Sequence, residues 1–172
     1  MDEMRLFVAI EFSNEVKEGL LKTISDLKSQ GAIGNFTRSE NLHVTLAFIG
    51  ETSRAVAAKA CLERIEFSGF ELTVGGSGNF GDLYWVGIEK NPSLSALASV
   101  VRKELLSAGF AIDEKPFKPH ITVARRLSSA NPPKVFTERR SMRVSEIVLM
   151  RSDRINGKLV YAPVFRKRLN NV

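Results

Sequence analysis

The sequence predicts an α+β protein built from a duplicated unit, and three observations support this prediction. The strand-like segment FVAIE at residues 7–11 returns as WVGIE at residues 85–89. A helical pattern follows each segment and ends at a glycine, Gly31 or Gly109, where a left-handed helix end favours glycine. A strand that opens with histidine comes next, at His43 in the first half and at His120 in the second.

This order predicts a bilobal domain with pseudo-two-fold symmetry over residues 1–172, made of repeat units of approximately 5–76 and 83–168. Each unit should contribute a mainly antiparallel sheet with helices on its outer face. Equivalent positions of the two units would then face each other across a central cleft, because clefts commonly form where two lobes meet.

Three helices are predicted from apolar residues that recur at helical spacing. The first covers residues 14–30, with Val16, Leu20, Leu21, Ile24 and Leu27 on one stripe. The helix at 93–108 has Leu94, Leu97, Ala98, Val101, Leu105 and Leu106 on its stripe. A further helix at 53–66 should turn Val56, Ala60 and Ile65 inward.

The remaining segments are predicted to be strands and loops. Residues 70–75 are typical of a strand, and the glycine-rich GGSGNFGD at 75–82 is expected to be a flexible connector. It does not fit a phosphate-binding P-loop because the lysine and the following Ser/Thr of that motif are missing. Residues 143–151 and 159–167 predict a hairpin around Asn156-Gly157, and Pro132-Pro133 marks a loop before it.

Composition limits the classes of function and location. The net charge of +6 and the pI of about 9.7 favour a polyanionic partner such as nucleic acid, although an inert basic surface is the alternative. Cys61 is the only cysteine, so no intramolecular disulfide can form and a reducing compartment is expected. The N-terminal sequence resembles neither a signal peptide nor a membrane span. We therefore expect a cytoplasmic protein without membrane contact, with a monomer as the default state.

The only two histidines of the chain open the same tetrad, HVTL at 43–46 and HITV at 120–123. Side chains alternate between the faces of a strand, so His43 shares a face with Thr45, and His120 shares one with Thr122. A single such tetrad would be explained by a core histidine that is hydrogen-bonded to threonine. Two tetrads at repeat-equivalent positions favour a functional site.

Two imidazoles suit in-line displacement at phosphorus, because one can accept a proton while the other donates one. The threonine hydroxyls could stabilise charge on the phosphate oxygens. A metal site fits less well, since neither tetrad contains a further ligand, and we expect no metal or cofactor. The G-x-S-x-G motif of many serine hydrolases is also missing.

The segments RLFVAIEF, HVTLAFIG and PHITVAR, with a closing strand pair that contains Tyr161, resemble the 2H phosphoesterases. The nearest branch is that of the RNA 2′,3′-cyclic phosphodiesterases, also called the 2′-5′ RNA ligase or LigT-like group. This resemblance implies a bilobal fold and metal-independent hydrolysis of RNA 2′,3′-cyclic phosphate ends to 2′-phosphates. It also implies ATP-independent 2′-5′ ligation. RNA ends, such as those of tRNA halves, or nucleoside 2′,3′-cyclic phosphates would be the substrates.

The resemblance also implies roles for individual residues. Our working hypothesis makes His120 the general base and His43 the general acid, with Thr45 and Thr122 on the phosphate oxygens. A nearly symmetric site gives no sequence reason to choose between the two directions of proton transfer. Another 2H activity on 2′-5′ oligonucleotides or nucleotide cyclic phosphates, or a non-catalytic RNA-binding module, remains an alternative.

Arg125 and three aromatic residues complete the predicted site. Arg125 corresponds to the arginine of the family's second motif and would bind phosphate. It lies five residues after His120, an odd offset, so it reaches the cleft only if the strand bulges or ends. Tyr161, Phe48 and Phe7 are candidates for stacking on a base, although Phe48 and Phe7 would also fit a core.

Overall fold

The structure is a computed structural model that describes residues 2–171, and its strands form two antiparallel sheets. One sheet, here called sheet A, has the order β3-β1-β8-β9, with bounds His43–Thr52, Met4–Glu11, Glu146–Ile155 and Lys158–Arg168. The other, sheet B, has the order β2-β6-β5-β4-β7, with bounds Ile33–Phe36, His120–Ser128, Leu83–Ile88, Phe70–Phe80 and Arg140–Val144. The predicted α+β class with two antiparallel sheets is therefore confirmed.

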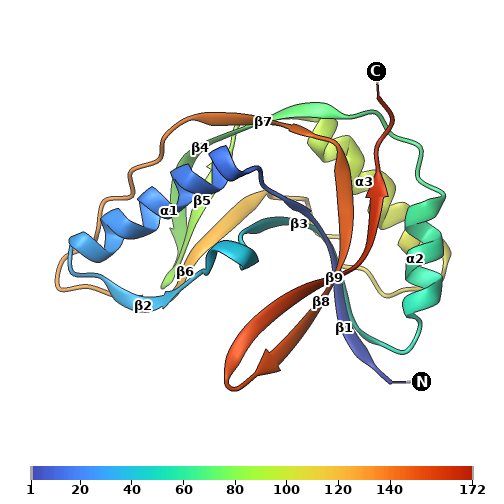
Figure 1. Cartoon of the computed structure of the whole chain (residues 1–172), viewed down its shortest axis with the longest axis horizontal. Coiled ribbons are helices and arrows are strands. Elements are labelled where there is room, and N and C mark those ends of the chain that lie inside the picture. The colour runs from blue at the N-terminus through green and yellow to red at the C-terminus, as the bar shows by residue number, and fades with distance from the viewer. Residues whose placement is uncertain (1, 172) are drawn as a thin grey trace.

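The helices lie on the outside of a strongly curved arch of strands, with α1 at one end and α2 and α3 at the other (Figure 1). Their bounds are Asn14–Ser29 for α1, Ala55–Glu63 for α2 and Pro92–Ser107 for α3, and a short 3₁₀ helix, η1, covers Ser39–Asn41. The β8–β9 hairpin extends from the body of the arch. Among the described residues, no helix is both long enough and apolar enough to span a bilayer.

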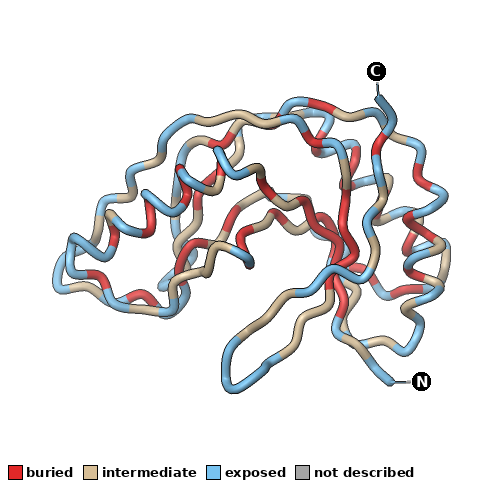
Figure 2. Tube along the Cα trace, viewed as in Figure 1, coloured by how far each residue is buried: buried red, intermediate tan, exposed pale blue. Residues whose placement is uncertain are grey.

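Each long helix packs on the sheet that does not contain the strand before it. Helix α1 follows β1 of sheet A but contacts β6 and β7 of sheet B, whereas α3 follows β5 of sheet B and contacts β3. The Arg102 side chain of α3 donates to the Leu46 carbonyl of β3 at 3.1 Å. The two predicted repeats therefore interlock around one continuous apolar core, which Figure 2 shows as buried residues along both sheets.

Local sequence explains where these helices begin and end. Ser13 caps α1 by accepting the Val16 N–H, and Asn91 caps α3 in the same way, with Pro92 at the first helical position. Gly31 and Gly109 adopt φ of 87° and 89°, the left-handed conformation that stops each helix.

The glycine-rich segment 75–82 is not a flexible connector, and this prediction was wrong. Strand β4 runs through it to Phe80, and only Gly81-Asp82 forms the turn into β5. The pairing of β4 with β5 shifts between Val74 and Ser77, so the two glycines between them form a bulge within the strand. Glycine weakens a strand signal in sequence, but pairing of Ser77–Phe80 with β5, in a strand whose first half also pairs with β7, holds this part of β4 in place.

Other corrections concern element boundaries. Val56 was expected to face inward but is 72% exposed, because α2 turns Ala58, Cys61 and Leu62 toward the core instead. The predicted strand at 143–151 spans the end of β7 in sheet B and most of β8 in sheet A. Strand β2 and η1 fill a stretch that the sequence pattern left as a linker. These short elements depend on tertiary pairing rather than on local pattern.

Candidate active site

The two histidine strands, β3 and β6, have the same irregular backbone. In β3, Val8 pairs with Ala47 and the next residue pairs with Thr45, so Leu46 is an extra residue. In β6, the same step between Ala124 and Thr122 leaves Val123 as the extra residue. Each strand therefore buries two consecutive side chains and then returns to the cleft face.

This bulge resolves the odd offset of Arg125. Without it, a side chain five residues after the histidine would point into the core. With it, β6 presents His120, Thr122 and Arg125 to one cavity, and β3 presents the equivalent His43, Thr45 and Phe48 to the same cavity.

The path of the chain between the sheets brings the histidines together. Just beyond β2, which pairs with β6 at the edge of sheet B, the Thr37 N–H donates to the Val123 carbonyl at 2.9 Å. The Thr37 hydroxyl donates to the Thr122 carbonyl at 2.8 Å. Only η1 separates this anchor from His43, so the first histidine strand must begin close to the second.

The resulting cavity has a volume of about 560 Å³ and lies between the two sheets. Its lining contains every site residue that the sequence analysis singled out: Phe7, His43, Thr45, Phe48, His120, Thr122, Arg125 and Tyr161. The structure adds Arg5, Ser152, Asp153, Arg154 and Leu159. Arg5 lies on the same face of β1 as Phe7, so the alternation of side chains along a strand could have indicated it. The other four could be placed only once the pairing of β1 with β8, and of β8 with β9, was known.

Both imidazoles are oriented by a backbone carbonyl two residues earlier. His43 Nδ1 lies 2.7 Å from the Asn41 carbonyl oxygen, and His120 Nδ1 lies 2.9 Å from that of Lys118. A carbonyl can only accept, so Nδ1 carries the proton in each ring and Nε2 is left for chemistry. His43 Nε2 lies 2.9 Å from Thr45 Oγ1, whose hydroxyl can donate to it.

The surroundings of His43 disfavour its protonation. Burial lowers the pKa of His43 below its ordinary value of 6.5, and the positive charges of Arg125 and His120 act in the same direction. The hydrogen bond to the Asn41 carbonyl and the charge of Glu11 oppose this shift without reversing it. In the free protein, His43 is therefore mostly neutral at pH 7.

An aromatic cluster encloses His43. The Phe7 ring centroid is 5.0 Å from that of His43, and the Tyr161 ring meets the His43 ring edge-on at 5.2 Å. Phe7 is only 3% exposed, which leaves little of its ring for a base and suits positioning of His43 instead. Phe48 is 61% exposed and offers a free ring at the cavity. Burial also raises the pKa of the Tyr161 hydroxyl, which stays protonated at neutral pH.

Asn41 is a positioning residue that the sequence analysis missed. Its carbonyl holds His43, while its side-chain nitrogen donates to the Leu159 carbonyl at 2.9 Å. Its side-chain oxygen also accepts the Tyr161 N–H at 3.4 Å. Asn41 is only 6% exposed, although asparagine is usually found at the surface. Its position two residues before the histidine motif was the available signal.

Within residues 2–171, no group of three His, Cys, Asp or Glu side chains has an arrangement that could hold a metal ion. The charged groups that line the cavity are mainly cationic, namely Arg5, Arg125 and Arg154 beside the single acid Asp153. Asp153 itself accepts a hydrogen bond from Arg151 at 2.7 Å. This electrostatic environment favours an anion such as a phosphate.

Comparison with known proteins agrees with this geometry. A family model described as the 2′-5′ RNA ligase superfamily matches residues 16–156. The chain belongs to this superfamily. The family membership that the sequence motifs predicted is confirmed.

Curated relatives of the chain carry the name RNA 2′,3′-cyclic phosphodiesterase. The relative from Escherichia coli K12 is 33% identical over 172 residues, covering 96% of each protein. The relative from Thermotoga maritima is 35% identical over 131 residues, covering 71% of this chain and 70% of its own length. A third, from Geobacillus stearothermophilus, is 29% identical over 141 residues. The match covers 77% of this chain but only 45% of the relative's length.

Solved structures show the same fold. The apo crystal structure of E. coli LigT superposes with a TM-score of 0.86 at 30% identity, covering 98% of this chain and 99% of LigT. LigT has also been crystallised with 3′-AMP, at a TM-score of 0.86 and 30% identity.

Proposed function

We propose that the protein hydrolyses the 2′,3′-cyclic phosphate end of RNA to a 2′-phosphate. One observation carries the proposal: both imidazoles, both motif threonines and Arg125 line one cavity. The names of the curated relatives support the same activity.

The geometry supports a two-histidine mechanism. A water oxygen attacks phosphorus while His120 Nε2 accepts its proton. The bond from phosphorus to the 3′ oxygen breaks, and His43 Nε2 supplies the proton that this oxygen needs. Arg125 and the hydroxyls of Thr45 and Thr122 stabilise the charge on the non-bridging oxygens. The product keeps its phosphate on the 2′ oxygen.

The acid role of His43 depends on the substrate. Its pKa is lowered in the free protein, so few molecules hold the required proton at pH 7. A phosphate anion in the cavity opposes the charge of Arg125 and stabilises the protonated His43 ring. The reverse assignment, with His43 as the base, is favoured by the free-protein pKa alone.

Leaving-group substitution separates these two assignments. With sulfur in place of the 3′ oxygen, departure needs little help from an acid, because a thiolate is a better leaving group than an alkoxide. If His43 is the acid, His43→Ala should lose far less activity on the sulfur substrate than on the oxygen substrate, whereas His120→Ala should lose the same on both. The opposite pattern would reverse the roles.

We extend the proposal to ligation. A 5′-hydroxyl that replaces water as the nucleophile would give a 2′-5′ linkage without ATP, because the cyclic ester already contains the strained bond. The same proton transfers and the same cavity serve both reactions. RNA halves with cyclic phosphate ends, including tRNA halves, are substrates of the required chemistry.

The primary test is turnover of nucleoside and oligonucleotide 2′,3′-cyclic phosphates in excess chelator, with the products followed by phosphorus NMR. We expect a 2′-phosphate as the only product and full activity with chelator. Loss of activity on chelation would indicate a metal-dependent reaction. Tight binding of RNA with no turnover would indicate a binding module, and turnover of 2′-5′ oligonucleotides alone would indicate a different 2H activity.

A further inference from the structure

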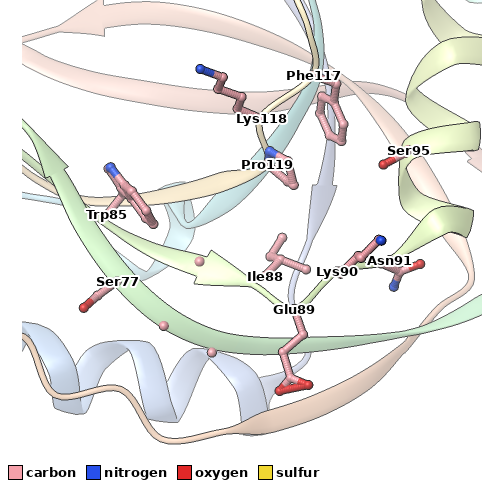
Figure 3. A pocket seen from close by; sticks show the side chains of 13 residues that line it. Ser77, Trp85, Ile88, Glu89, Lys90, Asn91, Ser95, Phe117, Lys118 and Pro119 are labelled. Carbon is pink, nitrogen blue, oxygen red and sulfur yellow. The ribbon is translucent and has the colours of Figure 1, made fainter.

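A second cavity of about 610 Å³ lies on sheet B beside the active site. It is lined by Gly75, Gly76, Ser77, Trp85, Gly87, Ile88, Glu89, Lys90, Asn91, Ser95, Phe117, Lys118 and Pro119. None of these residues lines the first cavity. Figure 3 shows Trp85 on one side of this second cavity and Phe117 on the other.

Glycines create the floor of the second cavity. The bulge at Gly75-Gly76 moves β4 out of regular pairing with β5. A Cβ added at Gly87 would come within 2.8 Å of the Gly75 carbonyl oxygen, so a side chain there would disturb the floor. Bulges of this kind are common next to active sites. The glycine-rich segment, which no catalytic role explains, thereby acquires a structural purpose.

The second cavity adjoins the active site at His120. Gly87 pairs with His120, and Trp85 pairs with Thr122. The Phe80 ring, which lines neither cavity, lies 5.5 Å from the Trp85 ring of the second cavity and 5.6 Å from the His120 ring of the first. Lys118, whose carbonyl orients His120, also lines the second cavity.

The chemistry of this surface suits a nucleotide. Phe80 is 52% exposed, which leaves ring surface for stacking against a base. Lys90 and Lys118 supply positive charge for a phosphate. The lining acid, Glu89, is already paired with Arg139 through hydrogen bonds of 2.5 and 3.1 Å, so its charge is offset.

Trp85 offers one further feature. Its indole nitrogen is the one buried side-chain polar atom without a hydrogen-bond partner within residues 2–171. Buried indole N–H groups usually have an acceptor. A ligand that shifts the Trp85 ring could supply an acceptor for this N–H.

We propose that Phe80, Trp85 and the glycine-floored cavity form a second nucleotide subsite, which binds an unpaired RNA residue next to the reacting one. This inference rests on the proposed function, since it places RNA in the first cavity. The RNA residue in this subsite could belong to either of two strands: the one that carries the cyclic phosphate, or the one that supplies a 5′-hydroxyl. A binding site beside His120 would then favour oligonucleotides over mononucleotides.

Trp85 provides a direct test, because it is the only tryptophan of the chain. We expect a trinucleotide that ends in a 2′-phosphate to change the fluorescence of Trp85 on binding. A nucleoside 2′-phosphate should change it little, because Trp85 does not line the first cavity. Calorimetry establishes that each ligand is bound at saturation. Equal fluorescence changes for the two bound ligands would exclude the strand that carries the cyclic phosphate, and the proposal fails if the second titration also leaves Trp85 unchanged.

A second titration distinguishes the two sources. A trinucleotide with a 5′-hydroxyl and no terminal phosphate is added to protein that is already saturated with nucleoside 2′-phosphate. A fluorescence change assigns the subsite to the strand that supplies the hydroxyl. If only the 2′-phosphate trinucleotide alters Trp85, the subsite belongs to the strand that carries the cyclic phosphate.

Lysine substitution tests the same subsite by kinetics. In the double variant Lys90→Ala/Lys118→Ala, we expect the ratio of kcat/KM for a trinucleotide to that for a mononucleotide to fall roughly three- to tenfold. The change keeps the Lys118 carbonyl on which His120 depends. Lys103→Ala, which removes an exposed lysine on α3 that lines neither cavity, is the control and should keep the ratio. If the titrations assign the subsite to the strand that supplies the hydroxyl, the same loss is expected in the rate of ligation to that strand, and values unchanged in both assays would contradict the proposal.

The two proposals can fail separately. If neither cyclic phosphate is turned over, the proposed function fails, and the Trp85 titrations with 2′-phosphate ligands still decide whether the subsite exists. If both substrates are turned over but neither trinucleotide alters Trp85, the proposed function stands and the subsite does not.

Discussion

Strands β3 and β6 have matching backbones and unlike side chains. Each presents a histidine, a threonine two positions later and, through the same bulge, a third residue five positions after the histidine. That third residue is Phe48 in β3 and Arg125 in β6. The two strands therefore form a nearly symmetric frame, while the proposed substrate, with an anionic phosphate and a flat base, requires unlike contacts on its two sides.

The surroundings of the two histidine rings also differ. His43 is enclosed by Phe7 and Tyr161, and burial lowers its pKa. His120 has Phe80 at its side and receives its orientation from Lys118, which also lines the second cavity. The closed environment of β3 therefore suits a fixed end of the proposed substrate, and the open side of β6 suits further RNA.

The largest expected effect comes from removal of either imidazole. We expect His43→Ala and His120→Ala each to lower kcat for a 2′,3′-cyclic nucleotide by about 10²–10⁴-fold, because each ring transfers one proton in the proposed mechanism. Circular dichroism checks that both variants fold. His43→Gln provides a second variant that can still fill the space between Phe7 and Tyr161. Normal turnover in either alanine variant would show that the two strands do not share one reaction.

The next largest effects distinguish the role of Arg125 from that of Phe48. Arg125→Ala should lower kcat by about 10²–10³-fold, since it removes a donor to the charged phosphate oxygens. Phe48→Ala should instead raise KM by about fivefold or more, since it removes base stacking. Steady-state kinetics on one cyclic nucleotide measure both.

Arg168→Ala is the matched charge control for Arg125, because Arg168 is exposed and does not line the cavity. It should leave both constants close to their original values. If Arg125→Ala and Phe48→Ala changed the same constant to the same degree, the asymmetry between the strands would have no functional meaning.

The smallest effect concerns the titration of His43. Because burial lowers its pKa, NMR should find His43 titrating below 6.5 in the free protein. Bound nucleoside 2′-phosphate should raise this pKa, so binding should take up a proton and strengthen as the pH falls toward the pKa of the free protein. A His43 pKa above 6.5, or one unaffected by the ligand, would contradict this account.

Two variants of Tyr161 sharpen this measurement. Tyr161→Ala opens one side of His43 to water, and we expect its pKa to move up toward 6.5. Tyr161→Phe keeps the ring and should leave the His43 pKa close to that of the original protein. Equal shifts in the two variants would assign the effect to the hydroxyl group and not to burial.

Much of the site could be predicted from the sequence because the relevant signals are local. Alternation along a strand places His43 beside Thr45, and His120 beside Thr122, whatever the rest of the chain does. Helical spacing and the glycine stops located all three α-helices to within about three residues. By contrast, the β4 extension through Gly75-Gly76 depends on neighbouring strands, so the local pattern suggested a loop.

Local sequence supplies the chemical groups: two imidazoles, two hydroxyls and a guanidinium, in two similar frames. The folded chain is what brings them to one cavity, turns Arg125 toward it through a bulge, and connects His43 to the β8–β9 hairpin through Asn41. The physical reason is that side-chain direction along one strand follows from local backbone geometry. Pairing register and the crossing of α1 and α3 between sheets follow from the burial of apolar surface contributed by the whole chain.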